Sequence, residues 1–287
     1  MLVKSRLLAH LHALVGERHP LSSSARLQET EHYLHSQLSE AGLALTMHEF
    51  QALGGTYRNV IGTARVLAAQ EKNRAPLVVA AHYDTVEDSP GADDNASALA
   101  VLLEVAQRTR QMLLERPVQF IALCLEEENL LGSRAYTAHL AATQQPIYGA
   151  VVLECVGYAK DDEGSQKIPP GIPIAVPTVG NFLAVIGNQA SAYFTNSVSQ
   201  AMNLHMPIIP LVVPGNGEAL PDTRRSDHTA FWERGFPAVM LTDTANFRNP
   251  HYHRPTDTID TLNLEFMAAV ADAVTGAVRA LAGLPDA

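Results

Sequence analysis

The residues with the greatest capacity for chemistry in this sequence are histidines and carboxylates that stand at or near the ends of apolar runs, or in the polar loops that follow them. They fall in five separated segments and are His82, Asp84, Asp94, Glu126, Glu127, Glu154 and His253. Imidazole nitrogens and carboxylate oxygens are the ligands that zinc and related divalent ions take in mixed sites. The set therefore predicts a metal site. The sequence contains neither the G-x-S-x-G element of serine hydrolases nor an H-E-x-x-H helix.

Two neighbouring ions need one bridging carboxylate, together with a histidine and a further carboxylate for each ion. The residues available for this are His82, Asp94, Glu127, Glu154 and His253, which predicts a co-catalytic site with two Zn²⁺ per chain. Asp84 stands two residues after His82, so an extended backbone places both side chains on one face. Asp84 can then accept the second ring N–H of His82 and fix its tautomer.

Glu126 and Glu127 are adjacent, so a regular strand cannot point both at one metal. One of them ligates, and the other is free to accept a proton from an attacking water. A general base beside two cations is the usual requirement for metal-assisted hydrolysis.

The elements that must position these residues alternate between apolar strands and amphipathic helices. Expected strands cover Leu45–Phe50, Tyr57–Leu67, Leu77–Ala81, Val118–Leu125, Tyr148–Val156, Phe182–Gly187 and Pro237–Thr242. Expected helices cover Ser22–Gly42, Asn95–Glu115, a stretch after Leu131, Ser191–Met202 and Thr261–Leu281. This alternation predicts a three-layer α/β fold, with a mixed, mostly parallel central sheet flanked by helices. Ligands collect at the carboxyl ends of the strands in such sheets.

Composition limits the class of protein. The chain has 287 residues, is 47% hydrophobic and carries a formal net charge of -10, which argues against nucleic acid or an anionic membrane as partner. We expect one domain over residues 1–287. Cys124 and Cys155 lie in apolar runs and are expected to be free and buried. No signal segment is visible, so we expect a cytoplasmic protein, or a secreted one if a signal has been removed. The oligomeric state is not readable.

Six segments together resemble a known family. They are VVAAHYDTV (78–86), PGADDNASA (90–98), EEENLLGS (126–133), VVLECVG (151–157), SDHTAFWERGFPAVMLTD (226–243) and HYHRPTDT (251–258). In this order they resemble the two-zinc aminopeptidases of the superfamily that also holds glutamate carboxypeptidase II and glutaminyl cyclase. The resemblance runs from about residue 20 to the end of the chain. It implies a zinc-exopeptidase-like fold and a peptide substrate cleaved at its N-terminal end.

The resemblance also implies a role for each matched position. His82 corresponds to a ligand of the first ion and Asp94 to the bridging carboxylate. Glu126 corresponds to the general base, and the ligand positions that remain are Glu127, Glu154 and His253. Asp227 and His228 correspond to substrate-binding residues. Family members often have a cis peptide after the bridging aspartate, here between Asp94 and Asn95. Asn129 stands where the family usually has Gly, and Asn tolerates the left-handed backbone that this position needs.

Several alternatives stay open at this stage. His251 could replace His253 as the last ligand. A glutaminyl cyclase-like acyltransferase would need one zinc and not the complete set. A carboxypeptidase or amidohydrolase of the superfamily would carry an inserted domain between Glu154 and His253, where only about 100 residues are available. A homologue that only binds partners would have lost ligands. For the pocket walls we expect Ala159–Asn188, much of it a long loop, and Leu211–Thr223.

Overall fold

The computed structural model describes residues 2–66 and 74–283. In this part of the chain an eight-stranded sheet has the order β1-β2-β4-β3-β5-β8-β6-β7. The strands are β1 (Ala44–Ala52), β2 (Gly55–Ala64), β3 (Leu77–His82), β4 (Val118–Leu123), β5 (Gly149–Glu154), β6 (Leu183–Asn188), β7 (Ile208–Val213) and β8 (Ala238–Thr242). The central strands β4, β3, β5 and β8 are parallel neighbours. β2 joins β4, and β8 joins β6, in antiparallel fashion.

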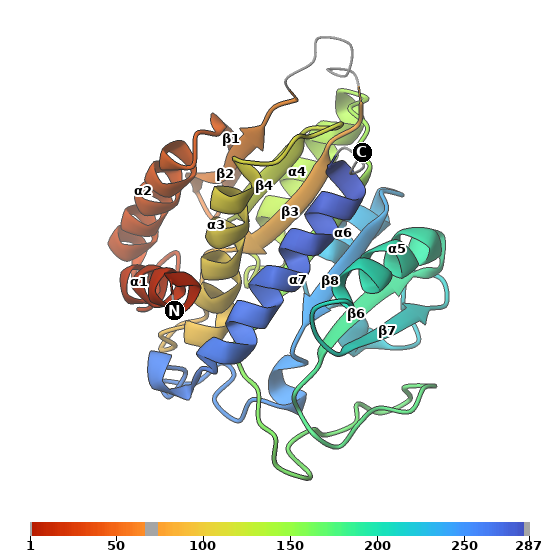
Figure 1. Cartoon of the computed structure of the whole chain (residues 1–287). Helices are drawn as coiled ribbons and strands as arrows, with labels where there is room; N and C mark the ends of the chain where they lie inside the picture. The colour runs from red at the N-terminus through yellow and green to blue at the C-terminus, as the bar shows by residue number, and fades with distance from the viewer. Residues whose placement is uncertain (1, 67–73, 284–287) are drawn as a thin grey trace.

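Helices cover both faces of the sheet (Figure 1). One face carries α1 (Leu2–Leu14), α2 (Ser24–Glu40), α3 (Ala98–Thr109), α5 (Ala192–Met202) and α7 (Leu264–Ala282). The other face carries α4 (Leu131–Ala142) and α6 (His228–Glu233). The three layers and the mixed, mostly parallel sheet confirm the predicted fold class.

The two faces of the sheet are buried by alternate residues of the same strand. In β3, Leu77 and Val79 belong to the core beneath α3 and α7, whereas Val78 and Ala80 belong to the core beneath α4 and α6. Because successive side chains in a strand point to opposite faces, a strand covered on both sides must be apolar throughout. This is why the continuous run LVVAA indicated a central strand.

The predicted boundaries differ from the structure in a few places. The helix expected from Asn95 begins only at Ala98, because Asp94 and Asn95 have non-helical backbone angles. It ends at Thr109, before the expected end at Glu115. β7 was not predicted as a strand, since Pro210 interrupts it. Proline cannot donate to a sheet ladder and is tolerated on an edge strand, which is where β7 lies. The short α6 was also not predicted. Leu67, the expected end of the second strand, lies outside the described residues.

Other expectations are confirmed. Helix α2 ends at Glu40, and Gly42 follows with a φ of 78°. Cys124 and Cys155 are free and buried. The chain between β5 and β6 is a long loop. None of the helices in the described ranges is long and apolar enough to cross a membrane.

Candidate metal centre

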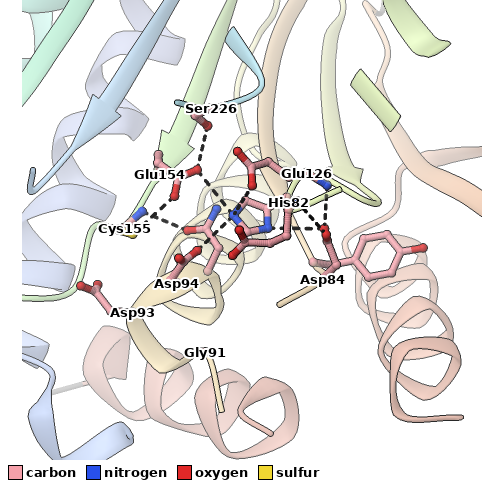
Figure 2. A network of polar contacts seen from close by, with 12 residues as sticks. His82, Asp84, Gly91, Asp93, Asp94, Glu126, Glu154, Cys155 and Ser226 are labelled. Atoms are coloured by element: carbon pink, nitrogen blue, oxygen red, sulfur yellow. Dashed lines mark hydrogen bonds and ion pairs between the residues drawn. The ribbon is translucent and has the colours of Figure 1, made fainter. Parts of the chain in front are cut away.

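Figure 2 shows five of the predicted site residues close together beside the ends of the central strands, and these are His82, Asp84, Asp94, Glu126 and Glu154. His82 is the last residue of β3, and Glu154 is the last residue of β5. Glu126 and Glu127 follow the end of β4 by a few residues. Asp94 lies in the connection between β3 and α3. Parallel strands end on the same edge of a sheet, so segments distant in the sequence meet there.

Two groups of potential ligands share the carboxylate of Asp94. In the first, Asp94 Oδ1 lies 3.1 Å from His82 Nε2, which is 3.5 Å from Glu154 Oε2. In the second, Asp94 Oδ2 lies 3.0 Å from His253 Nε2, which is 3.2 Å from Glu127 Oε1. Within each group the ligand atoms all lie within 4.8 Å of one another. Both groups therefore include the carboxylate of Asp94.

Several polar atoms of these groups lack the hydrogen bonds that buried groups need. Among the described residues, no hydrogen bond is made by His82 Nδ1 and Nε2, both carboxylate oxygens of Asp94, or Glu127 Oε1. Buried polar atoms without partners are costly, and several buried carboxylates in contact are more so. Bound cations would supply the missing interactions. The donor set of imidazole nitrogens and carboxylate oxygens fits two zinc ions.

The electrostatics of the cluster point the same way. Burial, together with the neighbouring charge of Asp94, raises the pKa of Glu127 to about 7. Burial would also raise the pKa of Asp94, but contacts with His253 and His82 lower it below its usual value. Burial lowers the pKa of His253, yet Asp94 and Glu127 outweigh this and bring it to about 10. The carboxylates of the cluster thus stabilise the protonated, positively charged form of His253.

Asp84 holds the segment that follows β4. Its two carboxylate oxygens accept the backbone N–H groups of Glu126 and Glu127, each at 3.0 Å. Its Oδ1 also lies 3.5 Å from His82 Nδ1, on the side of the ring predicted for it. Asp84 is completely buried. One carboxylate therefore orients both members of the glutamate pair and faces the imidazole of His82, a role only partly anticipated from the sequence.

Glu126 is placed differently from Glu127. Its side chain is buried, and its Oε2 lies 3.9 Å from His82 Nε2. Burial raises the pKa of its carboxyl well above the usual value, against the charge of His82, and Glu154 raises it further. With His82 and Glu127, Glu126 forms a third group whose potential ligand atoms all lie within 4.8 Å of one another. Asn129, two residues after Glu127, has a φ of 62°, which is the left-handed conformation expected there.

Further residues that were not singled out from the sequence support the ligands. Ser226 Oγ donates to Glu154 Oε2 at 2.7 Å (Figure 2). Asp93 accepts from the backbone N–H of Gly157 at 2.9 Å and from Asn249 Nδ2 at 2.7 Å. Asp93 thus connects the segment of Asp94 to the loops that carry Glu154 and His253. These contacts join residues far apart in the sequence, and no local signal identifies them.

Arg18 is a second contribution that the sequence did not reveal. No role was predicted for Arg18, but its side chain is fully buried. Its guanidinium donates to five backbone carbonyls, those of Leu14, Gly16, Tyr83, Pro90 and Gly91. The last three lie at the two ends of the loop between His82 and Asp94. Arg18 therefore fixes the loop that joins the first ligand to the shared one.

The remaining predictions concern two residues expected to bind substrate, the choice between two histidines and one peptide bond. Asp227 is fully buried near the cluster, and burial raises its pKa to about 7. His228 is also fully buried; its Nε2 lies 2.8 Å from the carbonyl oxygen of Thr223. Their substrate-binding role stays a prediction. His251 pairs with Thr256 at 3.0 Å, and His253 stands in the cluster. The peptide bond between Asp94 and Asn95 is cis, as expected.

A pocket begins at Glu154 and leads away from the cluster. Its floor is apolar, with Ile172, Ile186 and Met240 among its lining residues. The long loop after β5 contributes Pro169, and the segment before α6 contributes Leu220. Both segments were expected to form pocket walls, and the structure confirms this. The cluster thus adjoins a site in which a substrate side chain could lie.

Comparison with known proteins supports the same class of protein. Residues 59–278 match the family described as peptidase family M28. The chain belongs to this family. YfbL from Escherichia coli is 32% identical over 272 residues, which are 89% of this chain and 81% of YfbL. The relatives that follow are named as aminopeptidases, and this chain spans about half to two thirds of their length.

Two solved structures extend the comparison of this M28 chain. The LapA aminopeptidase of Legionella pneumophila superposes with a TM-score of 0.77 at 19% identity, covering 99% of this chain and 73% of LapA. It shows that the fold is shared. BSAP, a zinc aminopeptidase from Bacillus subtilis, superposes with a TM-score of 0.63 at 26% identity, covering 82% of this chain and 52% of BSAP. Family membership supports a peptidase function for this chain, and zinc is named for BSAP itself.

Proposed function

We propose that this chain is an aminopeptidase with two zinc ions and that Glu126 is its general base. The observation that carries the proposal is the shared carboxylate of Asp94. One of its oxygens faces His82, and the other faces His253. A single-zinc glutaminyl cyclase-like enzyme would not need both groups. The names of the relatives and of the solved structures favour aminopeptidase chemistry.

The residues of the chain divide the chemistry between them. When bound, the two ions supply Lewis-acid polarisation of the scissile carbonyl and of the attacking water. Glu126 accepts a proton from that water as the new carbon–oxygen bond forms. It then donates the proton to the nitrogen of the departing peptide as the carbon–nitrogen bond breaks. Asp84 keeps the backbone of Glu126 fixed through these steps, because it accepts that residue's N–H at 3.0 Å.

The surroundings of the cluster favour a substrate with a free N-terminal amine. The carboxylate of Glu154 both lines the pocket and belongs to the cluster, where it lies 3.5 Å from His82 Nε2. A protonated amine would find negative charge there, whereas an acylated N-terminus would bring a neutral group. The pocket that begins at Glu154 would then hold the side chain of the residue to be removed.

A carboxypeptidase or amidohydrolase with an inserted domain fits less well. The chain between Glu154 and His253 supplies β6, α5, β7, α6 and β8. These strands belong to the central sheet and the helices pack on it. Within the described residues this segment is therefore used for the core fold and contains no separate domain.

The proposal is tested with a Glu126→Gln variant and a matched Glu128→Gln control. Both glutamates belong to one run, but Glu128 pairs with His19 at 3.5 Å and belongs to none of the potential metal-binding groups among the described residues. We expect two zinc ions per chain in all three proteins by elemental analysis. Leucine p-nitroanilide should be cleaved by the wild type and the control, and N-acetylated leucine p-nitroanilide by neither. Glu126→Gln should lose at least about a hundredfold in kcat. An inactive zinc-loaded wild type would refute the aminopeptidase assignment.

A further inference from the structure

The pocket beside Glu154 contains a cation that the proposed reaction does not use. The guanidinium of Arg225 stands among the residues that line the pocket, together with Asn246 and Tyr252. Arg225 Nη1 donates to Asn246 Oδ1 at 2.9 Å, and Nη2 donates to the Tyr252 hydroxyl at 3.1 Å. Both partners are uncharged. The rest of the lining is mostly apolar, with Glu154 and Asp222 as its two carboxylates, so Arg225 supplies the positive charge of this wall.

Two separate contacts place Arg225 close to the metal centre. The next residue in the chain, Ser226, donates to Glu154 Oε2 at 2.7 Å. The ring of Tyr252, which holds the guanidinium, stacks on the ring of His253 with centroids 3.9 Å apart. Arg225 is thus adjacent in the chain to the partner of Glu154, and its guanidinium donates to the tyrosine that stacks on His253. A substrate whose scissile carbonyl lies over the cluster has its neighbouring residues within about 4 Å along the chain.

The charge of Arg225 is only weakly balanced by the protein. Its one acidic neighbour within 4 Å among the described residues is Asp222, at 3.6 Å, and both side chains are 42% exposed. An exposed pair at that distance contributes little. A guanidinium has five N–H donors in a planar fork that matches a carboxylate. Two donors are taken by Asn246 and Tyr252, so others remain for a ligand in the pocket.

We infer that Arg225 binds a carboxylate carried by a residue next to the scissile bond, which makes short or acidic peptides the preferred substrates. This inference rests on the proposed aminopeptidase function. The carboxylate can have two sources. It is either the C-terminal carboxylate of a dipeptide or the side chain of an N-terminal Glu or Asp. Both present the same planar anion to the guanidinium, and they are separated by the choice of substrate.

The experiment compares matched substrates. Leucyl-glycine and leucyl-glycinamide differ only in the C-terminal carboxylate, and the p-nitroanilides of glutamate and glutamine differ only in the side-chain charge. Wild type, Arg225→Gln and Arg224→Gln are assayed with zinc. Arg224 is the matched control, because it donates to the Asn216 carbonyl and pairs with Glu233, and it does not line the pocket.

We expect kcat/KM to favour one charged substrate over its neutral partner by about tenfold in the wild type and in Arg224→Gln. The ratio should fall to about one in Arg225→Gln and recover in part in Arg225→Lys. The pair that shows this identifies the source of the carboxylate. Ratios that are equal in Arg225→Gln and wild type for both pairs would overturn the inference.

A binding measurement separates this inference from the proposed function. Calorimetric titration of leucyl-glycine and leucyl-glycinamide, and of glutamate amide and glutamine amide, into zinc-loaded Glu126→Gln needs no turnover. The same titrations are repeated in Glu126→Gln/Arg225→Gln. A tenfold preference for a charged ligand that the second substitution removes supports the carboxylate site even if the wild type cleaves no peptide. The inference would be refuted if, in both proteins, the charged and the neutral ligand of each pair had the same dissociation constant, even if the enzyme is an active aminopeptidase.

Discussion

Replacing Asp84 by Asn should damage the site although Asp84 ligates nothing in the proposed arrangement. The carboxylate accepts the N–H groups of Glu126 and Glu127, both at 3.0 Å, in a fully buried position. The amide of Asn keeps one acceptor oxygen and turns an N–H₂ donor toward the other N–H. One buried N–H is then unsatisfied, which costs about 1–3 kcal/mol. The bond that remains loses its charge assistance, which costs about 1 kcal/mol more.

These losses add to a decrease of about 3 kcal/mol in the free energy of unfolding of the zinc-loaded protein. Because the backbone of the glutamate pair shifts, we also expect zinc to bind about 10–100-fold more weakly, and kcat to fall by a similar factor. Urea denaturation in saturating zinc measures the first effect. Competition with a zinc-binding dye measures the second.

The matched control is Asp88→Asn, an exposed aspartate in the same loop with a φ of 62°, a conformation that Asn also adopts. It should leave both quantities at wild-type values. The reasoning would be refuted if Asp84→Asn and Asp88→Asn had the same unfolding free energy and the same zinc affinity.

Two further predictions concern buried side chains outside the proposed ligand set. Arg18→Lys keeps the charge but cannot reach five carbonyls, so unfolding should be easier by about 3 kcal/mol. Thermal melts compare it with the exposed Arg110→Lys, and equal melting temperatures would contradict the role given to Arg18. The pKa of His228 is lowered by burial to about 4. An unfolded His titrates near ~6.5, so the unfolded state takes up the proton first as the pH falls. The stability that His228 contributes above pH ~6.5 is thus lost between about pH 6.5 and 4. Urea denaturation should show the wild type losing about 3 kcal/mol more than His228→Gln across this window. Parallel pH profiles for the two proteins would refute this.

Much of the candidate site could be predicted from the sequence, because its residues follow apolar runs that are recognisable locally. Apolar runs such as LVVAA suit strands covered on both faces, and the polar residues at the ends of parallel strands then share one edge of the sheet. This reasoning brought His82, Glu127 and Glu154 to one place, and the six family segments supplied the roles of Asp94 and His253. The edge strand β7 was not predicted from the sequence, because Pro210 interrupts the local pattern. It is identified as a strand by its pairing with β6.

The tertiary structure decided how the ligands are shared and what holds them. The sequence offered five ligands, but the pairing of His82 with Glu154 and of His253 with Glu127 around Asp94 depends on distances between five separate segments. The choice of His253 over His251 likewise follows from the path of one loop. Other features of the site also depend on residues that are mostly far apart in the chain. They are the hydrogen bonds of Arg18 to backbone carbonyls, the two hydrogen bonds that Asp84 accepts, and the position of Arg225 in the pocket that Glu154 lines. Hydrogen bonds of this kind leave no periodic trace in a sequence, whereas burial by strands and helices does, because burial repeats with the period of the element.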